Sequence, residues 1–167
     1  ITNAKSAKPT PVKHFTMGRS AHENPSIMPD NKTVYLTDDG SSKGFYKFVA
    51  DTANDMSSGT LYAAKITQDQ SVTDSAKAGF DIAWIKLASG NNTNIKKVID
   101  TFNDVDRSAY VKEETSYIKD ADILNNPLHA FIETLRYSAA RGATTEFNKM
   151  EGIAINYEGL KAGTAPY

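Results

Sequence analysis

The sequence predicts a mainly β fold with inserted helices, α+β over this length, whose strands form an antiparallel meander. Three observations predict it. Short apolar or alternating runs recur between residues 33 and 88, separated by turns rich in Gly, Ser, Asn and Asp. Two stretches with helical spacing follow residue 90. The chain has 167 residues, of which 40% are apolar and 23% charged, which suffices for one domain with a core.

Each strand is expected from its own pattern. A Pro-Asp-Asn turn precedes the first one, and the second alternates Phe45, Lys47 and Val49 against Tyr46 and Phe48. The expected strands are residues 33–37, 44–50, 59–67 and 80–88. Four strands in this order are about what one β-propeller blade needs. Residues 1–16, which are polar and contain two prolines, are expected to form an extended arm or an edge strand.

Helices are expected after Gly90. Thr93 is the predicted cap of the first, and Asn126 caps a second in which Pro127 takes the first position and Gly142 marks the end. The apolar stripes are Ile95, Val98, Ile99 and Phe102 in the first helix and Leu128, Phe131, Ile132 and Leu135 in the second. A last strand is expected to begin just after Glu151.

Composition excludes several classes of function. The net charge of −1 gives no electrostatic case for binding nucleic acid or an anionic membrane. No apolar run is long enough to span a bilayer. The sequence contains no cysteine, so disulfides and thiolate metal sites within the chain are excluded, and this fits an exported protein.

Polar side chains gather around the first expected strand: Arg19, His22, Glu23, Asp38 and Asp39. Each has an ordinary structural interpretation. Glu23 fits a solvated loop, Asp38 and Asp39 fit a hairpin turn, and Arg19 fits an ion pair with a surface acid. His22 either bonds to nearby backbone or orients Glu23 as a second-shell group.

Five motifs occur in order: MGRSAHEN, KTVYLTDDG, GFYKFVA, GTLYAAKI and RYSAARGATTEFNKMEGI. With them the chain resembles PhoX-type alkaline phosphatases over nearly its whole length, as an internal segment of that family. The resemblance implies a bacterial phosphomonoesterase that is periplasmic or secreted. It also implies a β-propeller with inserted helices, and a site in which iron and calcium ions bind and activate a phosphate ester.

The resemblance further implies roles for single residues. Glu23, Asp39 and Glu151 match acids that serve as metal ligands, with His22 and Asp38 as second-shell groups or alternates. Carboxylates suit such a site, because hard cations prefer oxygen ligands.

Lys149 stands where the family usually carries an arginine that grips phosphate. Lysine keeps the positive charge but loses the bidentate fork, so the efficiency of hydrolysis is in question. The alternative is therefore a non-catalytic calcium-binding propeller or envelope binding protein.

The resemblance also divides the chain. Residues 17–90 are expected to form a β-meander, residues 91–148 a helical insertion, and residues 149–167 the start of the next blade. Further ligands are expected to lie outside this chain, so the isolated segment is expected to be inactive. Exposed sheet edges favour self-association.

Overall fold

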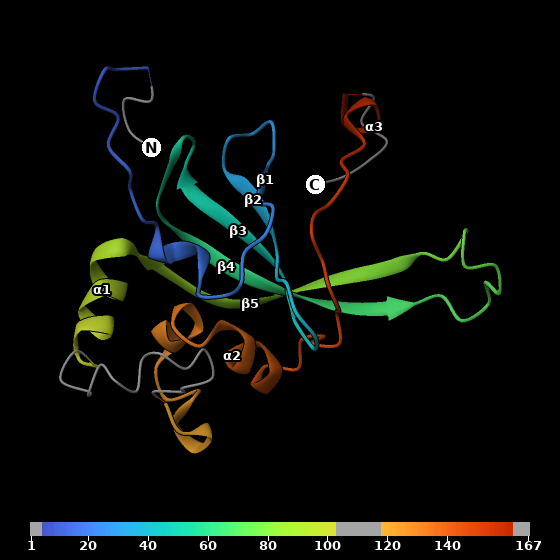
Figure 1. Cartoon of the computed structure of the whole chain (residues 1–167). Coiled ribbons are helices and arrows are strands. Elements are labelled where there is room, and N and C mark those ends of the chain that lie inside the picture. Colours follow the sequence, from blue (N-terminus) through green and yellow to red (C-terminus); the bar gives the residue numbers. More distant parts are fainter. Residues whose placement is uncertain (1–4, 103–117, 162–167) are drawn as a thin grey trace.

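The computed structural model describes residues 5–102 and 118–161, and its centre is an antiparallel β-sheet (Figure 1). The sheet is open and five-stranded, with the strands side by side in sequence order. The strands are β1 (Ser26–Ile27), β2 (Thr33–Thr37), β3 (Phe45–Thr52), β4 (Asp55–Gln68) and β5 (Phe80–Asn91). The mainly β class and the antiparallel meander are therefore confirmed.

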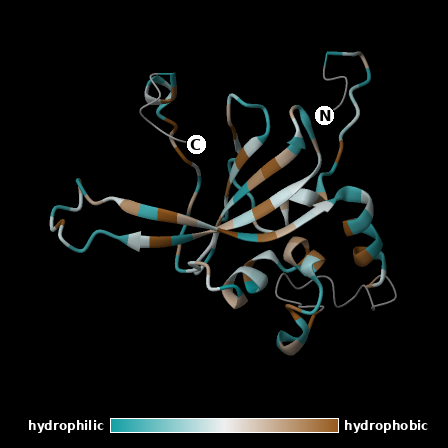
Figure 2. Ribbon diagram, turned by 180° about the vertical axis from the view of Figure 1, so that it is seen from behind, coloured by the Kyte–Doolittle hydropathy of each residue, from teal (hydrophilic) through white to brown (hydrophobic). Residues whose placement is uncertain are grey.

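Short helical elements surround the sheet. The 3₁₀ helices are η1 (Phe15–Met17), η3 (Asp120–Asp122) and η4 (Pro127–Phe131). The α-helices are α1 (Asn92–Asp100), α2 (Thr134–Ala140) and α3 (Tyr157–Lys161). Apolar positions concentrate in the strands and in the helices beside them, whereas the connecting loops are largely hydrophilic (Figure 2).

Side-chain alternation gives the sheet two different faces. Val34 pairs with Phe48, which pairs with Leu61, and all three side chains are fully buried on what we call the core face. Tyr35 pairs with Lys47 on the opposite face, and both are only partly buried. The period of two predicted from the sequence therefore separates a packed face from a half-covered one.

Helical elements cover the core face (Figure 1). Ile95 of α1 is fully buried in the hydrophobic cluster, together with Phe131 of η4. A Cβ at Gly90 of β5 would lie 2.9 Å from the Phe131 ring and 3.2 Å from Leu128. A glycine is therefore needed where η4 packs most closely on the sheet.

The cap of α1 differs from the prediction. The Asn91 side chain, at the end of β5, accepts the Asn94 amide at 2.9 Å. Thr93 lies inside the helix instead. Several good capping residues follow one another here, and the end of strand pairing at Asn91 selects among them.

The second predicted helix is divided into η4 and α2. Asn126 caps η4, as predicted, and its side chain accepts the Leu128 amide at 2.9 Å. Glu133 then leaves helical geometry, with φ −125° and ψ 54°. The Thr134 hydroxyl donates to the Ala130 carbonyl at 2.8 Å, a local bond that competes with the helical ladder. Gly142, at φ +78°, ends α2 as predicted.

The strand predicted after Glu151 is wrong. Residues 151–156 belong to no strand and lead into α3, where the Asn156 side chain accepts the Gly159 amide at 2.8 Å. A strand needs a neighbouring strand edge, but this segment crosses the half-covered sheet face instead and buries Ile153 and Ile155 partly there.

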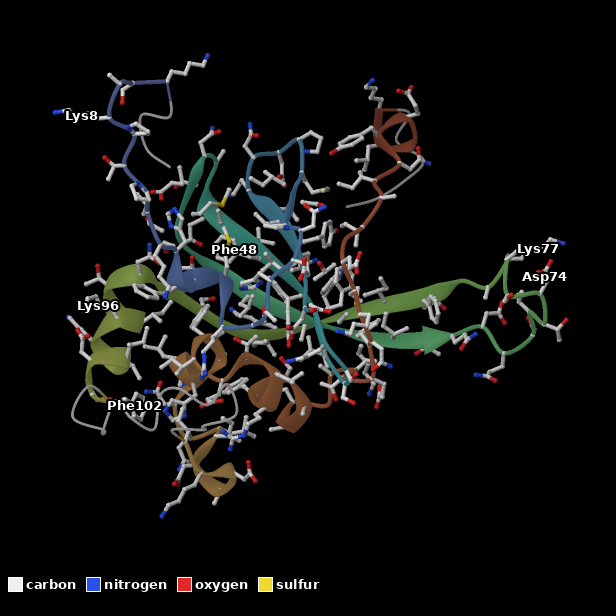
Figure 3. All side chains as sticks on the ribbon, viewed as in Figure 1. Lys8, Phe48, Asp74, Lys77, Lys96 and Phe102 are labelled. Carbon is white, nitrogen blue, oxygen red and sulfur yellow. The ribbon has the colours of Figure 1, made fainter. Side chains whose placement is uncertain are left out.

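The β4–β5 hairpin extends well beyond the body of the molecule (Figure 1). Asp74 and Lys77 form an ion pair of 3.4 Å at its tip (Figure 3). Residues 5–14 add no strand to the five-stranded sheet, although Thr10 forms a single β-bridge, so the described part of the amino-terminal segment is mainly an extended arm. Parts of the predicted helical insertion (103–117) and of the predicted next blade (162–167) lie outside the described residues.

Candidate functional site

Three segments that are far apart in sequence meet at the carboxyl end of β2. We call their meeting point the motif junction, formed by residues 18–24, 37–43 and 147–152. The Asp39 amide donates to the Ala21 carbonyl at 2.9 Å, and the Glu23 amide donates to the Thr37 carbonyl at 3.3 Å. These backbone bonds fix the first segment beside the second.

The third segment is attached to the connection between β2 and β3. Lys43 and Phe147 exchange two backbone hydrogen bonds, of 2.8 and 3.2 Å. The Lys149 amide donates to the Gly40 carbonyl at 2.8 Å. The Ser42 amide donates to the side-chain oxygen of Asn148, the residue before Lys149. Backbone hydrogen bonds therefore attach the third segment to the junction.

Asp38 is buried inside the junction, with 1% of its surface exposed. Its carboxylate accepts the Ala21 amide at 2.9 Å. Burial raises the pKa of Asp38, against the opposing effects of the Ala21 hydrogen bond and of the nearby Lys43 charge. Asp38 therefore holds the segment that carries Glu23, and its carboxylate does not face solvent.

Asp39 and Lys149 form an ion pair at the surface of the junction. The Asp39 carboxylate lies 3.4 Å from the Lys149 ammonium and also accepts the Gly40 amide at 2.6 Å. Lys149 keeps 70% of its side chain exposed. Its φ of +53° lies in the left-handed region that few non-glycine residues adopt. The Lys149 ammonium and the Asp39 carboxylate therefore lie side by side at the accessible surface of the junction.

Glu23 and Glu151 are both exposed. Their neighbours in sequence approach each other, since a Cβ at Gly152 would lie 3.1 Å from the Asn24 side-chain nitrogen. The two acids therefore belong to adjacent backbone segments, one from each end of the chain. The family resemblance assigns both acids to the same site.

His22 is held by its own loop. Its ring bonds to the Ser20 hydroxyl at 2.9 Å and lies 3.3 Å from the Gly18 carbonyl. The backbone at His22 forms an isolated β-bridge with Asp38. These contacts match the interpretation of a histidine bonded near its own backbone.

Sequence reasoning missed Glu133, whose carboxylate is 8% exposed and lies between two arginines. Arg19 approaches it at 3.9 Å and Arg136 at 3.5 Å. The Arg19 amide also donates to the Thr134 hydroxyl at 2.9 Å, which fastens the first motif to the start of α2. The Glu133–Arg136 spacing of three was the available signal, but nothing local predicts that Arg19 joins it.

The described residues do not assemble a complete metal site. No group of three or more His, Cys, Asp or Glu side chains among residues 5–102 and 118–161 is arranged to hold an ion. Calcium takes about six to eight oxygen ligands. Glu23, Asp39 and Glu151 therefore supply suitable donor atoms but do not fit a metal by themselves.

The comparison with known families gives a match whose range includes all three segments of the junction. The family described as Alkaline phosphatase PhoX matches residues 2–162. The chain belongs to this family. Membership in the PhoX family supports a hydrolytic, phosphatase-type function and a phosphomonoester substrate.

Two other comparisons found nothing. No curated protein matches the chain. No solved structure matches it either. A separate structural finding concerns membranes: the helices in the described part of the chain are all too short or too polar to cross one.

Proposed function

We propose that this PhoX-family chain contributes the motif junction to a phosphomonoesterase. Lys149 contacts the substrate phosphate, and Glu23, Asp39 and Glu151 act as metal ligands. The observation that supports this proposal is the convergence of three segments, in which Asp39 and Lys149 meet across 110 residues, with a lysine and three acids at the junction. A phosphate monoester carries nearly two negative charges, so it needs cations around it.

We further propose iron and calcium as the cofactors, for which carboxylate oxygens are suitable ligands. Because the described acids do not complete a site, ligands from outside the described residues are needed. We propose that some of these ligands come from outside the chain, in which case the chain on its own is inactive.

Lys149 sets a limit on phosphate binding. An ammonium is a point charge, whereas an arginine presents a planar fork that matches two phosphate oxygens. The Asp39 carboxylate also competes with phosphate for the same ammonium at 3.4 Å. We therefore expect weak phosphate binding unless a metal ion is bound to the Asp39 carboxylate.

The proposal also covers the larger fold to which the sheet belongs. We propose that it is a portion of a β-propeller, in which residues 17–90 form a meander, residues 91–148 a helical insertion and residues 149–167 lead to the next blade. We also propose a periplasmic or secreted location. The long edge strand β5 exposes Phe80 and Ile82, which favours self-association or pairing with further strands.

A calcium-binding protein without catalysis is the second candidate. It is supported by Lys149 in place of the usual arginine and by the exposed positions of Glu23 and Glu151. It predicts calcium-dependent stability without ester hydrolysis.

The test combines elemental analysis of the purified chain with hydrolysis of 4-nitrophenyl phosphate in added iron and calcium. Turnover that Glu23→Gln abolishes and Glu146→Gln preserves would support the site and correct the expected inactivity. Glu146 is a suitable control, because it is exposed and close to the third segment in sequence.

If the wild-type chain shows no turnover, calcium titration calorimetry tests the site. We expect an affinity of about millimolar, which Glu23→Gln and Glu151→Gln weaken and Glu146→Gln does not. Equal calcium affinity in all variants would contradict the metal-ligand assignment. Calcium that stabilises a chain unable to bind orthophosphate would favour the second candidate.

A further inference from the structure

A pocket of about 460 Å³ lies between the half-covered face of the sheet and residues 153–160. The sheet contributes Tyr35, Phe45 and Trp84, and the crossing segment contributes Ile153 and Ile155. A volume of this size, with an apolar and aromatic lining, is typical of small-molecule sites.

The three aromatic rings form one cluster. The Trp84 ring centroid lies 5.7 Å from that of Tyr35 and 5.5 Å from that of Phe45. The Lys47 ammonium lies 4.5 Å from the Trp84 centroid and adds a cation–π contact. Packed rings of this kind present flat apolar surfaces and ring edges, against which another aromatic ring packs at similar distances.

The pocket adjoins the motif junction. Phe45 pairs with Thr37, two residues before Asp39. Its ring also lies 6.3 Å from that of Phe147, two residues before Lys149. The aromatic lining therefore begins beside the end of β2 and beside the segment at Phe147, the two places that lead to the ion pair of the candidate site.

We propose that this pocket binds the aryl group of an aromatic phosphomonoester whose phosphate lies at Lys149. The inference rests on the proposed function and names its substrate class. Hydrolysis cleaves the phosphorus–oxygen ester bond: the water oxygen ends on phosphorus, and a water proton ends on the released phenol. The aryl group is the same in the substrate and in the leaving group. The pocket therefore contributes to substrate binding and specificity.

Trp84 provides the readout, since the sequence contains one tryptophan. The purified chain is titrated with phenyl phosphate, phenol, glycerol phosphate and inorganic phosphate while the tryptophan emission is recorded. We expect phenyl phosphate and phenol to change the emission, and the two ligands without a ring to leave it unchanged.

A matched pair of variants locates the binding. Ile82→Glu places a charge in the lining at a residue that is 43% exposed, so the substitution is compatible with folding. Phe80→Glu makes the same kind of change two residues earlier, on the same side of β5 and outside the lining, at a residue that is 58% exposed. We expect Ile82→Glu to weaken phenyl phosphate binding about tenfold or more, and Phe80→Glu to leave it unchanged. Circular dichroism of both variants confirms that they fold.

The outcomes separate the two proposals. No emission change with phenyl phosphate, or equal weakening in both variants, would overturn the aryl pocket. Equal affinities for phenol and phenyl phosphate would keep the pocket and count against the phosphate contact at Lys149. Glycerol phosphate that binds as tightly as phenyl phosphate, measured by calorimetry, would keep the phosphate contact and overturn the aryl specificity.

Discussion

The Lys149 ammonium lies 3.4 Å from the Asp39 carboxylate, across 110 residues of sequence. The position of Lys149 does not depend on this pair alone, because its amide also donates to the Gly40 carbonyl at 2.8 Å. With 70% of the lysine side chain exposed, the ion pair itself contributes little to stability. The backbone of Lys149 is therefore held in place, and its exposed ammonium is accessible to an anionic ligand.

Lys149→Arg is expected to tighten binding of orthophosphate by on the order of 1 kcal/mol, about fivefold, because a guanidinium can bond two oxygens at once. Lys149→Gln should weaken it by removing the charge. Isothermal titration calorimetry measures both. Lys161→Gln, an exposed lysine in α3, is the control and should have no effect. Unchanged affinity in both Lys149 variants would place phosphate elsewhere.

Asp38 should make the protein less stable as the pH rises. Burial raises its pKa in the folded state, so the folded chain holds this proton more tightly than the unfolded chain, whose carboxyl has a pKa of about 3.8. The favourable contribution is complete below pH 3.8 and is lost as the pH passes through the raised folded value.

Asp38→Asn tests this effect, because the amide oxygen can still accept the Ala21 amide but cannot titrate. We expect a free energy of unfolding at neutral pH equal to or above that of the wild type, and a weaker fall between acid and neutral pH. Asp38→Ala should instead cost about 1–3 kcal/mol by leaving a buried donor without its acceptor. Denaturant titrations across pH give both values, and a destabilised Asn variant would refute the account.

Asp30, at the other end of β2, should have the opposite pH dependence. Its carboxylate accepts the amides of Lys32 and Thr33 at 2.9 and 2.8 Å, and the Thr33 hydroxyl at 2.7 Å. Burial raises the pKa of Asp30, but these hydrogen bonds outweigh it and the net pKa is lowered. The stabilisation is therefore present above pH 3.8 and is lost as the pH falls through the lowered folded value.

Asp30→Ala should cost about 1–2 kcal/mol at neutral pH, a value reduced for the partial exposure of the carboxylate, and less in acid. Asp30→Ser keeps an acceptor at this turn and should recover part of the loss. Denaturant titration at neutral and acid pH measures the difference. A cost that does not shrink in acid would show that the charge is not involved.

Tyr46→Phe should not destabilise the protein. The Tyr46 hydroxyl is buried and has no hydrogen-bond partner among the described residues. Asp38 and Ser138 lie close enough to affect its pKa, which burial raises strongly. Removing an unsatisfied hydroxyl should leave stability unchanged or raise it by up to about 1 kcal/mol. Thermal and denaturant unfolding measure this, and a clear loss would mean that the hydroxyl is bonded in solution.

Several elements follow from local sequence alone. The period-two pattern of Tyr46 and Phe48 against Lys47 is a property of neighbouring residues, and it correctly predicts β3 and the alternation of its side chains. Asn126 and Gly142 mark helix ends through their own conformational preferences, and both positions are confirmed. The metal-ligand roles of the three acids and the phosphate contact of Lys149 remain predictions, although short motifs identify these residues.

Local sequence patterns predict β2 to β5, their antiparallel order and the motif residues, because these depend on interactions between near neighbours. The two-residue strand β1 is too short to show such a pattern. Packing in three dimensions brings Arg19 to Glu133 and Lys149 to Asp39. It also places the segment after Glu151 across the aromatic face instead of in the sheet. Such contacts arise when distant segments pack together, and the free energy that selects them comes from burial and backbone pairing across the whole fold. No local sequence pattern indicates this free energy. The sequence therefore identifies the candidate residues, and the tertiary fold determines which of them come into contact.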